Sequence, residues 1–243
     1  MDSEDHDEQD GSDVPASGNS SNSSSSSSPS SSSNDRPAPG EALNPGWAGN
    51  PTSPRQAATV ILLRGGTETL EVLLVRRTPE AKFMGGVWVF PGGAVDADDG
   101  DGDDGVRAAA MRELREEAAI TLAEPGELVA FSRWITPAEV KIRFDTHFFL
   151  APLPQGQEPR IDGEECVDLG WFTPQAALDA HAAGEIVLVF PTIAHLERLI
   201  PFASVDALLA HAREVEVEVE PVLPKVIVEG DSARVLMPGD PGY

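Results

Sequence analysis

The sequence predicts an α/β fold, an α/β/α sandwich in which helices cover both faces of a mixed β-sheet. Three observations predict it. Short apolar, β-branched runs recur between residues 57 and 172, strong helix formers interrupt them at residues 106–118, and further helix signals follow them.

Two apolar runs open the predicted sheet. Residues 57–64 and 70–77 are separated by Gly65-Gly66-Thr67, which predicts a β-hairpin. Residues 87–90 predict a short strand that stops at Pro91-Gly92-Gly93.

A loop and a helix come next. Residues 96–105 are nearly all Asp and Gly and predict a solvent-exposed loop. Residues 106–118 predict a helix, and its buried stripe is expected to hold Ala109, Leu114 and Ala118.

The second half mixes strands and helices. Strands are predicted at residues 127–135, 143–151 and 167–172, and helices at residues 174–183, 191–200 and 204–213. Thr173 is the expected N-cap of the first of these helices, with Pro174 at its first position and Gly184 as its stop. The strict alternation of residues 215–219 predicts a strand, with residues 225–229 and 233–237 as its partners.

The first 54 residues differ in composition from the rest. They are rich in Ser, Asp, Asn, Gly and Pro and nearly devoid of large apolar side chains. Such a segment buries too little apolar surface to offset the entropy of ordering its backbone. We therefore expect a disordered tail over residues 1–54 and one domain over residues 55–243.

The chain is strongly acidic, with a formal net charge of −24. The tail holds nine acidic residues and one Arg, so the domain is itself acidic. Nucleic acids and anionic membranes require a basic face, and neither is expected as a partner. A small phosphate ligand stays compatible, because divalent cations and a few arginines can reverse the field in a cleft.

Cysteine content and hydropathy limit the cellular compartments in which we expect the protein. Cys166 is the single cysteine, which excludes an intrachain disulfide and predicts a core residue. No apolar stretch is long enough for a membrane span, and the acidic N-terminus has no signal-peptide core. We expect a soluble, cytoplasmic protein.

Three carboxylates share one face of the predicted helix. Glu113 lies three residues before Glu116 and four before Glu117. A solvated acidic helix supported by Arg112 is one interpretation. Crowding like charges costs about 0.2–0.5 kcal/mol per pair, however, and a divalent metal with hard oxygen ligands would remove that repulsion.

This segment resembles the box of the Nudix family, which runs Gly, five residues, Glu, seven residues, then Arg-Glu-apolar-any-Glu-Glu-any-Gly-apolar. Gly93 matches the first glycine, and the distal half is matched by Arg112, Glu113, Leu114, Glu116, Glu117 and Ile120. Asp104 is the expected counterpart of the first Glu, after an insertion in the acidic loop, and Ala119 replaces the usual glycine.

The resemblance implies a Nudix-type sandwich and a Mg²⁺- or Mn²⁺-dependent hydrolase of a small-molecule diphosphate. The metal ligands would be the Gly93 carbonyl, Glu113, Glu116 and Glu117, with Arg112 orienting the carboxylates. The general base stays open between Glu113 and Glu164 or Glu165, for which a solvated loop is the alternative interpretation.

A second resemblance concerns the substrate. Coenzyme A diphosphatases of the Nudix family carry a signature before the box, matched here without a gap by Leu73, Leu74, Arg77, Gly86, Phe90, Pro91, Gly92 and Gly93, with Val75, Thr78 and Lys82 as conservative replacements. It implies coenzyme A or acyl-coenzyme A as substrate, bound by Gly92, Arg77 and Lys82. The two cations are candidates for contacting the adenosine 3′-phosphate, and ordinary surface charge is their alternative interpretation.

Two rival functions remain open. A nucleotide-sugar or dinucleoside pyrophosphatase would use the same box, because the box handles only the shared diphosphate. A catalytically silent Nudix-fold binding module is the other, suggested by Ala119 and the insertion.

Overall fold

The computed structural model describes residues 52–81, 84–140, 142–214, 219–229 and 232–243. The predicted tail falls almost entirely outside these ranges. The same is true of Lys82 and of most of the strand expected at residues 215–219.

The described residues form a mixed sheet, as predicted. Its strand order is β3-β2-β1-β6-β5-β8, while β4 pairs with β1 and β7 with β2. The β1–β6 and β5–β8 pairs are parallel, and the other pairs of this sheet are antiparallel. The strand bounds are Arg55–Arg64 (β1), Glu71–Arg77 (β2), Trp88–Val89 (β3), Gly92–Ala94 (β4), Val129–Ile135 (β5), Phe144–Pro152 (β6), Cys166–Phe172 (β7) and Pro221–Val222 (β8).

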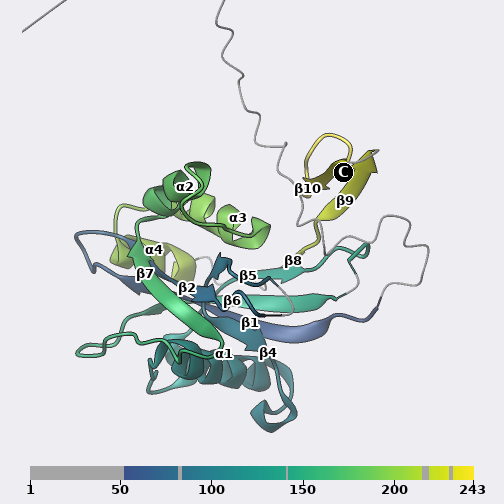
Figure 1. Cartoon of the computed structure of the whole chain (residues 1–243). Coiled ribbons are helices and arrows are strands. Elements are labelled where there is room, and N and C mark those ends of the chain that lie inside the picture. The colour runs from purple at the N-terminus through teal and green to yellow at the C-terminus, as the bar shows by residue number, and fades with distance from the viewer. Residues whose placement is uncertain (1–51, 82–83, 141, 215–218, 230–231) are drawn as a thin grey trace, which may run out of the picture. The chain divides into compact units, whose positions relative to one another are not determined.

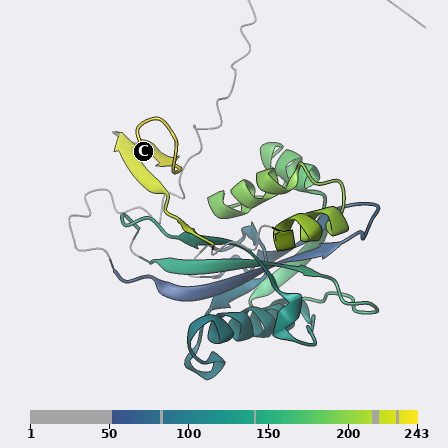
Figure 2. The same ribbon diagram turned by 180° about the vertical axis from the view of Figure 1, so that it is seen from behind.

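Helices cover both faces of this sheet. Figures 1 and 2 show α1 on one face and α2, α3 and α4 on the other. Their bounds are Gly102–Ala118 (α1), Pro174–Ala182 (α2), Phe190–Leu199 (α3) and Val205–Glu214 (α4). Thr173 caps α2 as predicted, because its Oγ1 accepts a hydrogen bond of 3.2 Å from the backbone N–H of Ala176. The α/β/α sandwich is confirmed.

The two-residue period of β1 divides the core into two layers. Val60 and Leu62 pack with the α1 side chains, among them the predicted stripe of Ala109, Leu114 and Ala118. Ile61 and Leu63 point to the opposite face, where they join side chains of α2, α3 and α4. Cys166 is fully buried, as predicted.

One local prediction around the glycine turn is wrong, and one strand was not predicted. Residues 96–105 are not a continuous loop, because a 3₁₀ helix, Ala97–Asp99, forms within them and α1 already begins at Gly102. Acidic residues in the first turn of α1 favour this early start, since the N-terminal end of a helix dipole attracts negative charge. β3 stops before Pro91, as predicted, but Gly92–Ala94 then pairs with β1 as the additional strand β4.

The helix end and the C-terminal strands complete the fold. Ala119 adopts the left-handed conformation, with φ of 55°, at the position where the box expects glycine. Beyond α4, the strands Lys225–Glu229 (β9) and Ser232–Leu236 (β10) pair with each other in a separate antiparallel sheet. No helix within the described ranges is long and apolar enough to cross a membrane.

Candidate active site

The Gly92-Gly93 turn lies directly against two carboxylates of α1. The Gly92 N–H donates a hydrogen bond of 2.9 Å to Glu117 Oε2. A Cβ added at Gly93 would lie 2.4 Å from Glu113 Oε1, so only glycine allows this carboxylate to approach so closely. The pairing of β4 with β1 holds the turn in this position.

Burial makes both carboxylates reluctant to ionise. It raises the pKa of Glu117 to about 7, an effect that the Gly92 N–H opposes and the charge of Glu113 reinforces. Burial also raises the pKa of the Glu113 carboxyl, against the opposing effect of Arg112. Glu117 is therefore a buried carboxyl whose ionised form is disfavoured both by burial and by the neighbouring charge of Glu113.

Glu116 lies apart from this pair. Its side chain is 51% exposed, and its two oxygens pair with Arg112 at 3.0 Å and with Arg115 at 3.4 Å. Glu113 and Glu117 line the same pocket, and Glu116 is not among the residues that line it. Within the described part of the chain, no group of three or more His, Cys, Asp or Glu side chains is arranged to hold a metal ion.

Arg112 connects the α1 carboxylates to the inserted acidic segment. Its guanidinium forms a bidentate pair with Asp99, with bonds of 3.0 and 2.9 Å. It also donates to the Ala94 carbonyl at 3.0 Å and to Glu113 Oε1 at 2.8 Å. The hydrogen bond to Asp99 is the largest cause of a raised pKa of Arg112, so the group stays charged. Arg112 thus holds Glu113 in place from outside the pocket.

The expected role of Asp104 passes to Asp99. Asp104 is exposed in the first turn of α1, whereas the Asp99 side chain is 6% exposed and pairs with Arg112. Five residues separate Gly93 from Asp99, which is the spacing of the box. The insertion therefore follows this acidic position, and counting from Gly93 would have located it.

Arg77 is the predicted cation that the structure places at the site. Its Nη1 lies 3.9 Å from Glu117 Oε1, and the residue lines the pocket. Its buried Nε has no hydrogen-bond partner. Lys82, the other predicted cation, lies outside the described residues.

The structure separates the two candidate bases of the acidic loop. Asp162 accepts hydrogen bonds of 2.9 Å from the backbone N–H groups of Glu165 and Cys166, which fixes the end of the loop. Glu165 lines the pocket, and Glu164 is not among the lining residues. A charge on Glu165 also raises the pKa values of both Glu113 and Glu117.

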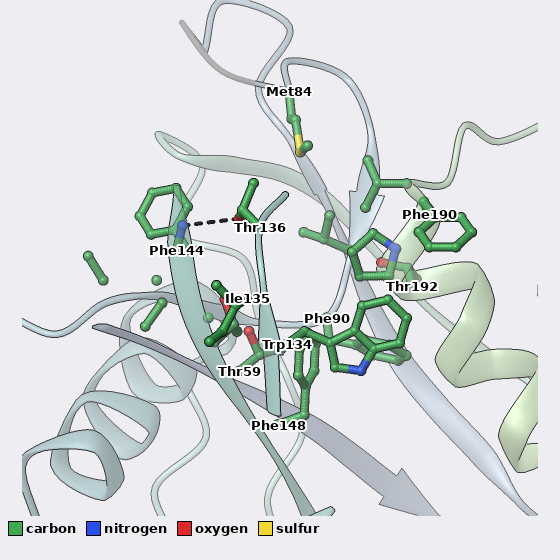
Figure 3. A pocket seen from close by; sticks show the side chains of 18 of the residues that line it. Thr59, Met84, Phe90, Trp134, Ile135, Thr136, Phe144, Phe148, Phe190 and Thr192 are labelled. Carbon is green, nitrogen blue, oxygen red and sulfur yellow. Dashed lines mark hydrogen bonds between the residues drawn. The ribbon is translucent and has the colours of Figure 1, made fainter. Parts of the chain in front are cut away.

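The pocket extends far beyond the acidic end, with a volume of about 520 Å³. Figure 3 shows an aromatic wall of this pocket, formed by Phe90, Trp134, Phe148 and Phe190. Sequence reasoning did not assign this wall. Its members are spread over about a hundred residues, and apolar residues in strands are ordinarily core.

A buried histidine supports the aromatic wall from behind. His195 is 1% exposed, and its ring stacks on Phe148 with a centroid distance of 4.1 Å. Its Nε2 lies 2.5 Å from Ser132 Oγ and its Nδ1 lies 2.6 Å from the Pro191 carbonyl. Because a carbonyl can only accept, Nδ1 carries the proton and Ser132 donates to Nε2. Burial lowers the pKa of His195 to about 4, so the ring is neutral at pH 7.

Comparisons with known proteins agree with this architecture. The NUDIX domain profile matches residues 53–190. A Caenorhabditis elegans protein named "Putative nudix hydrolase 7" is 31% identical in an alignment of 187 residues, and the match covers 62% of this chain and 62% of that protein. The human acyl-coenzyme A diphosphatase NUDT19 is 34% identical over 119 residues, 46% of this chain and 31% of that protein.

The fold also matches a solved structure. A NUDIX hydrolase from Alicyclobacillus acidocaldarius superposes with a TM-score of 0.60 at 27% identity, over 65% of this chain and 96% of that one. This chain spans between about a third and two thirds of the length of the two curated relatives. The domain match covers more than half of the chain and includes the glycine turn, α1 and most of the pocket, and on this ground the chain belongs to the Nudix family.

Proposed function

We propose that this chain is a metal-dependent hydrolase that cleaves the diphosphate linkage of coenzyme A or acyl-coenzyme A. One observation carries the proposal: the buried Glu117 and the half-buried Glu113 lie against a glycine turn at one end of a pocket of about 520 Å³. This is a site for a charged group flanked by a bulky, largely uncharged one.

The acidic end has the chemistry to hold Mg²⁺ or Mn²⁺. Carboxylate and carbonyl oxygens are the hard ligands that these ions prefer. The charge of Glu113 raises the pKa of Glu117, the charge of Glu116 raises the pKa of Glu113, and a nearby cation would favour the ionised form of both Glu113 and Glu117. Glu113, Glu117 and the Gly93 carbonyl would hold the ion, and Glu116 would need to turn away from Arg112 to join them. When bound, a divalent ion offsets the charge of the diphosphate and acidifies water.

Side chains of this chain would carry out the remaining steps of diphosphate hydrolysis. Arg77 would bind the diphosphate, and Arg112 positions Glu113. A water oxygen attacks one phosphorus, the bridging P–O bond breaks, and a general base takes the water proton. Glu113 and Glu165 are the candidates that line the pocket. Glu165 is the better placed for proton transfer, because Glu113 is hydrogen bonded to Arg112, whereas no described side chain occupies the Glu165 carboxylate.

Two findings support coenzyme A as the substrate. The coenzyme A diphosphatase signature is matched without a gap from Leu73 to Gly93. The human relative NUDT19 is named an acyl-coenzyme A diphosphatase.

A panel of diphosphates tests the proposal. Coenzyme A, acyl-coenzyme A, a nucleotide sugar and a dinucleoside polyphosphate are incubated with the protein and Mg²⁺ or Mn²⁺, with EDTA as the matched control. We expect chromatography to show 4′-phosphopantetheine, or its acylated form, and adenosine 3′,5′-bisphosphate, only with metal. Cleavage of the nucleotide sugar alone would refute the substrate, and no cleavage at all would indicate a binding module.

A further inference from the structure

The floor of the pocket is one face of neighbouring strands. Alternate residues of a strand share a face, and the parallel register of β1 and β6 sets them in rows. The rows that line the pocket are Arg55 with Phe144, Ala57 with Thr146, and Thr59 with Phe148. Arg55 and Phe144 therefore share the row farthest from the aromatic wall around Phe148. Figure 3 shows Phe144 beside Thr136, away from Phe90 and Trp134.

The acidic end borders this floor at the glycine turn. The register of β4 places Gly93 opposite Ala58 and Gly92 opposite Thr59. Arg55 precedes Ala58 by three residues, which is about 10 Å along a strand. A long arginine side chain at that distance can contact a second anionic group on a substrate whose diphosphate lies at the glycine turn.

The charges of the pocket are unevenly distributed. Among the described residues, five charged side chains line the pocket, and four of them belong to the acidic end: Arg77, Glu113, Glu117 and Glu165. Arg77 lies within 3.9 Å of Glu117 and is therefore engaged there. Arg55 is the fifth of these described residues, it is exposed, and its side chain forms no ion pair with any described residue.

We infer that Arg55 and Phe144 form a second anion subsite, in which Arg55 binds a phosphomonoester on the nucleoside arm and Phe144 contacts the base. Guanidinium groups suit phosphate oxygens, and an aromatic face suits a base. The inference rests on the proposed function and deepens it. In coenzyme A this phosphomonoester is the adenosine 3′-phosphate, so Arg55 takes the role first assigned to Arg77 and Lys82.

Paired substrates test the assignment. Steady-state rates of Arg55→Ala are compared for coenzyme A and dephospho-coenzyme A, which differ only in the 3′-phosphate. A charge-assisted hydrogen bond predicts a roughly ten- to hundredfold rise in KM for coenzyme A with kcat retained, and little change for dephospho-coenzyme A. The penalty should shrink in high salt, and Arg55→Lys should recover part of the loss. Arg213→Ala on α4, an exposed arginine that does not line the pocket, is the matched control.

Equilibrium binding of the wild type and Arg55→Ala to adenosine 3′,5′-bisphosphate and AMP gives a second measurement that needs no turnover. If Arg55→Ala loses affinity for the bisphosphate but not for AMP, the subsite is supported. This holds even if no coenzyme A is cleaved, a result that would refute only the proposed function. Equal effects of Arg55→Ala on both ligands, or no effect, would overturn the subsite. So would a loss selective for coenzyme A in Arg77→Ala, which we expect to impair both substrates alike.

Discussion

The acidic end and the aromatic end of the pocket differ in the charge that their side chains carry. At the acidic end, Glu117 is buried, Glu113 is half-buried, and burial raises the pKa values of both carboxyls. At the aromatic end, the buried His195 is held neutral among rings, with both nitrogens hydrogen bonded. The carboxylates of the acidic end lower the stability of the fold but provide a site for charge. The neutral His195 of the aromatic end contributes to packing. Substitutions at the acidic end should therefore change turnover, and those at the aromatic end should change stability.

The largest effect is expected from Glu117→Gln. Losing a carboxylate beside the diphosphate removes several kcal/mol of electrostatic stabilisation, which predicts a decrease in kcat of about 10²- to 10³-fold. The melting temperature in EDTA should be unchanged or higher, because a buried group with a raised pKa becomes neutral. Rates close to wild type at saturating Mg²⁺ would show that the assignment is wrong.

Glu116→Gln provides the comparison within the same helix. The family resemblance predicts an equal loss, whereas the exposed position of Glu116 and its pairing with Arg112 predict a smaller one in kcat. An equal loss in both variants would show that Glu116 turns into the pocket during catalysis.

A matched pair of aspartates tests the support of the acidic end. Asp99→Asn removes the bidentate partner of Arg112 and should lower kcat by roughly ten- to a hundredfold, the range of outer-shell partners of metal ligands. Asp104→Asn changes an exposed residue and should leave kcat within about twofold. The reverse order would restore Asp104 as the counterpart of the first Glu of the box.

At the aromatic end, His195 should make the unfolding free energy depend on pH. The folded pKa of His195, about 4, lies below the ordinary value of 6.5, so the unfolded chain binds more protons between these values. The unfolding free energy should fall as the pH decreases from 6.5 to 4, by up to about 1.4 kcal/mol per pH unit.

A double variant, His195→Phe with Ser132→Ala, removes both side chains of the Ser132–His195 hydrogen bond. In denaturant titrations it should lose the pH dependence of the unfolding free energy that His195 causes. Glu117 has the opposite slope in an overlapping range, since its folded pKa is raised, and it cancels in the difference between variant and wild type. Identical slopes would contradict a buried neutral His195.

The smallest effect is expected outside the pocket altogether. Deleting residues 1–50 should leave kcat and the melting temperature nearly unchanged, because that segment has little apolar surface to bury. A large loss of either would contradict the domain that we propose for residues 55–243.

The sequence predicted the elements that depend on local pattern. The apolar run of β1, the helical period of α1 and the Thr173 cap all depend on neighbours a few residues apart, and each is present. The early start of α1 and the pairing of β4 were missed because Asp- and Gly-rich segments have weak intrinsic preferences, which helix electrostatics and the neighbouring β1 edge decide.

The sequence by itself also determined the acidic helix face, since three carboxylates at this spacing share one side of any α-helix. Only the tertiary structure decided which of them enter the pocket. At 3.6 residues per turn, Glu117 lies about 40° from Glu113 around the helix axis, and Glu116 lies about 100° from Glu117. The pocket reaches one side of that arc and solvent the other, as the exposed fraction of Glu116 shows. Glu165, the aromatic wall and Arg55 likewise join the site through strand register and packing, which bring together residues that no local pattern connects.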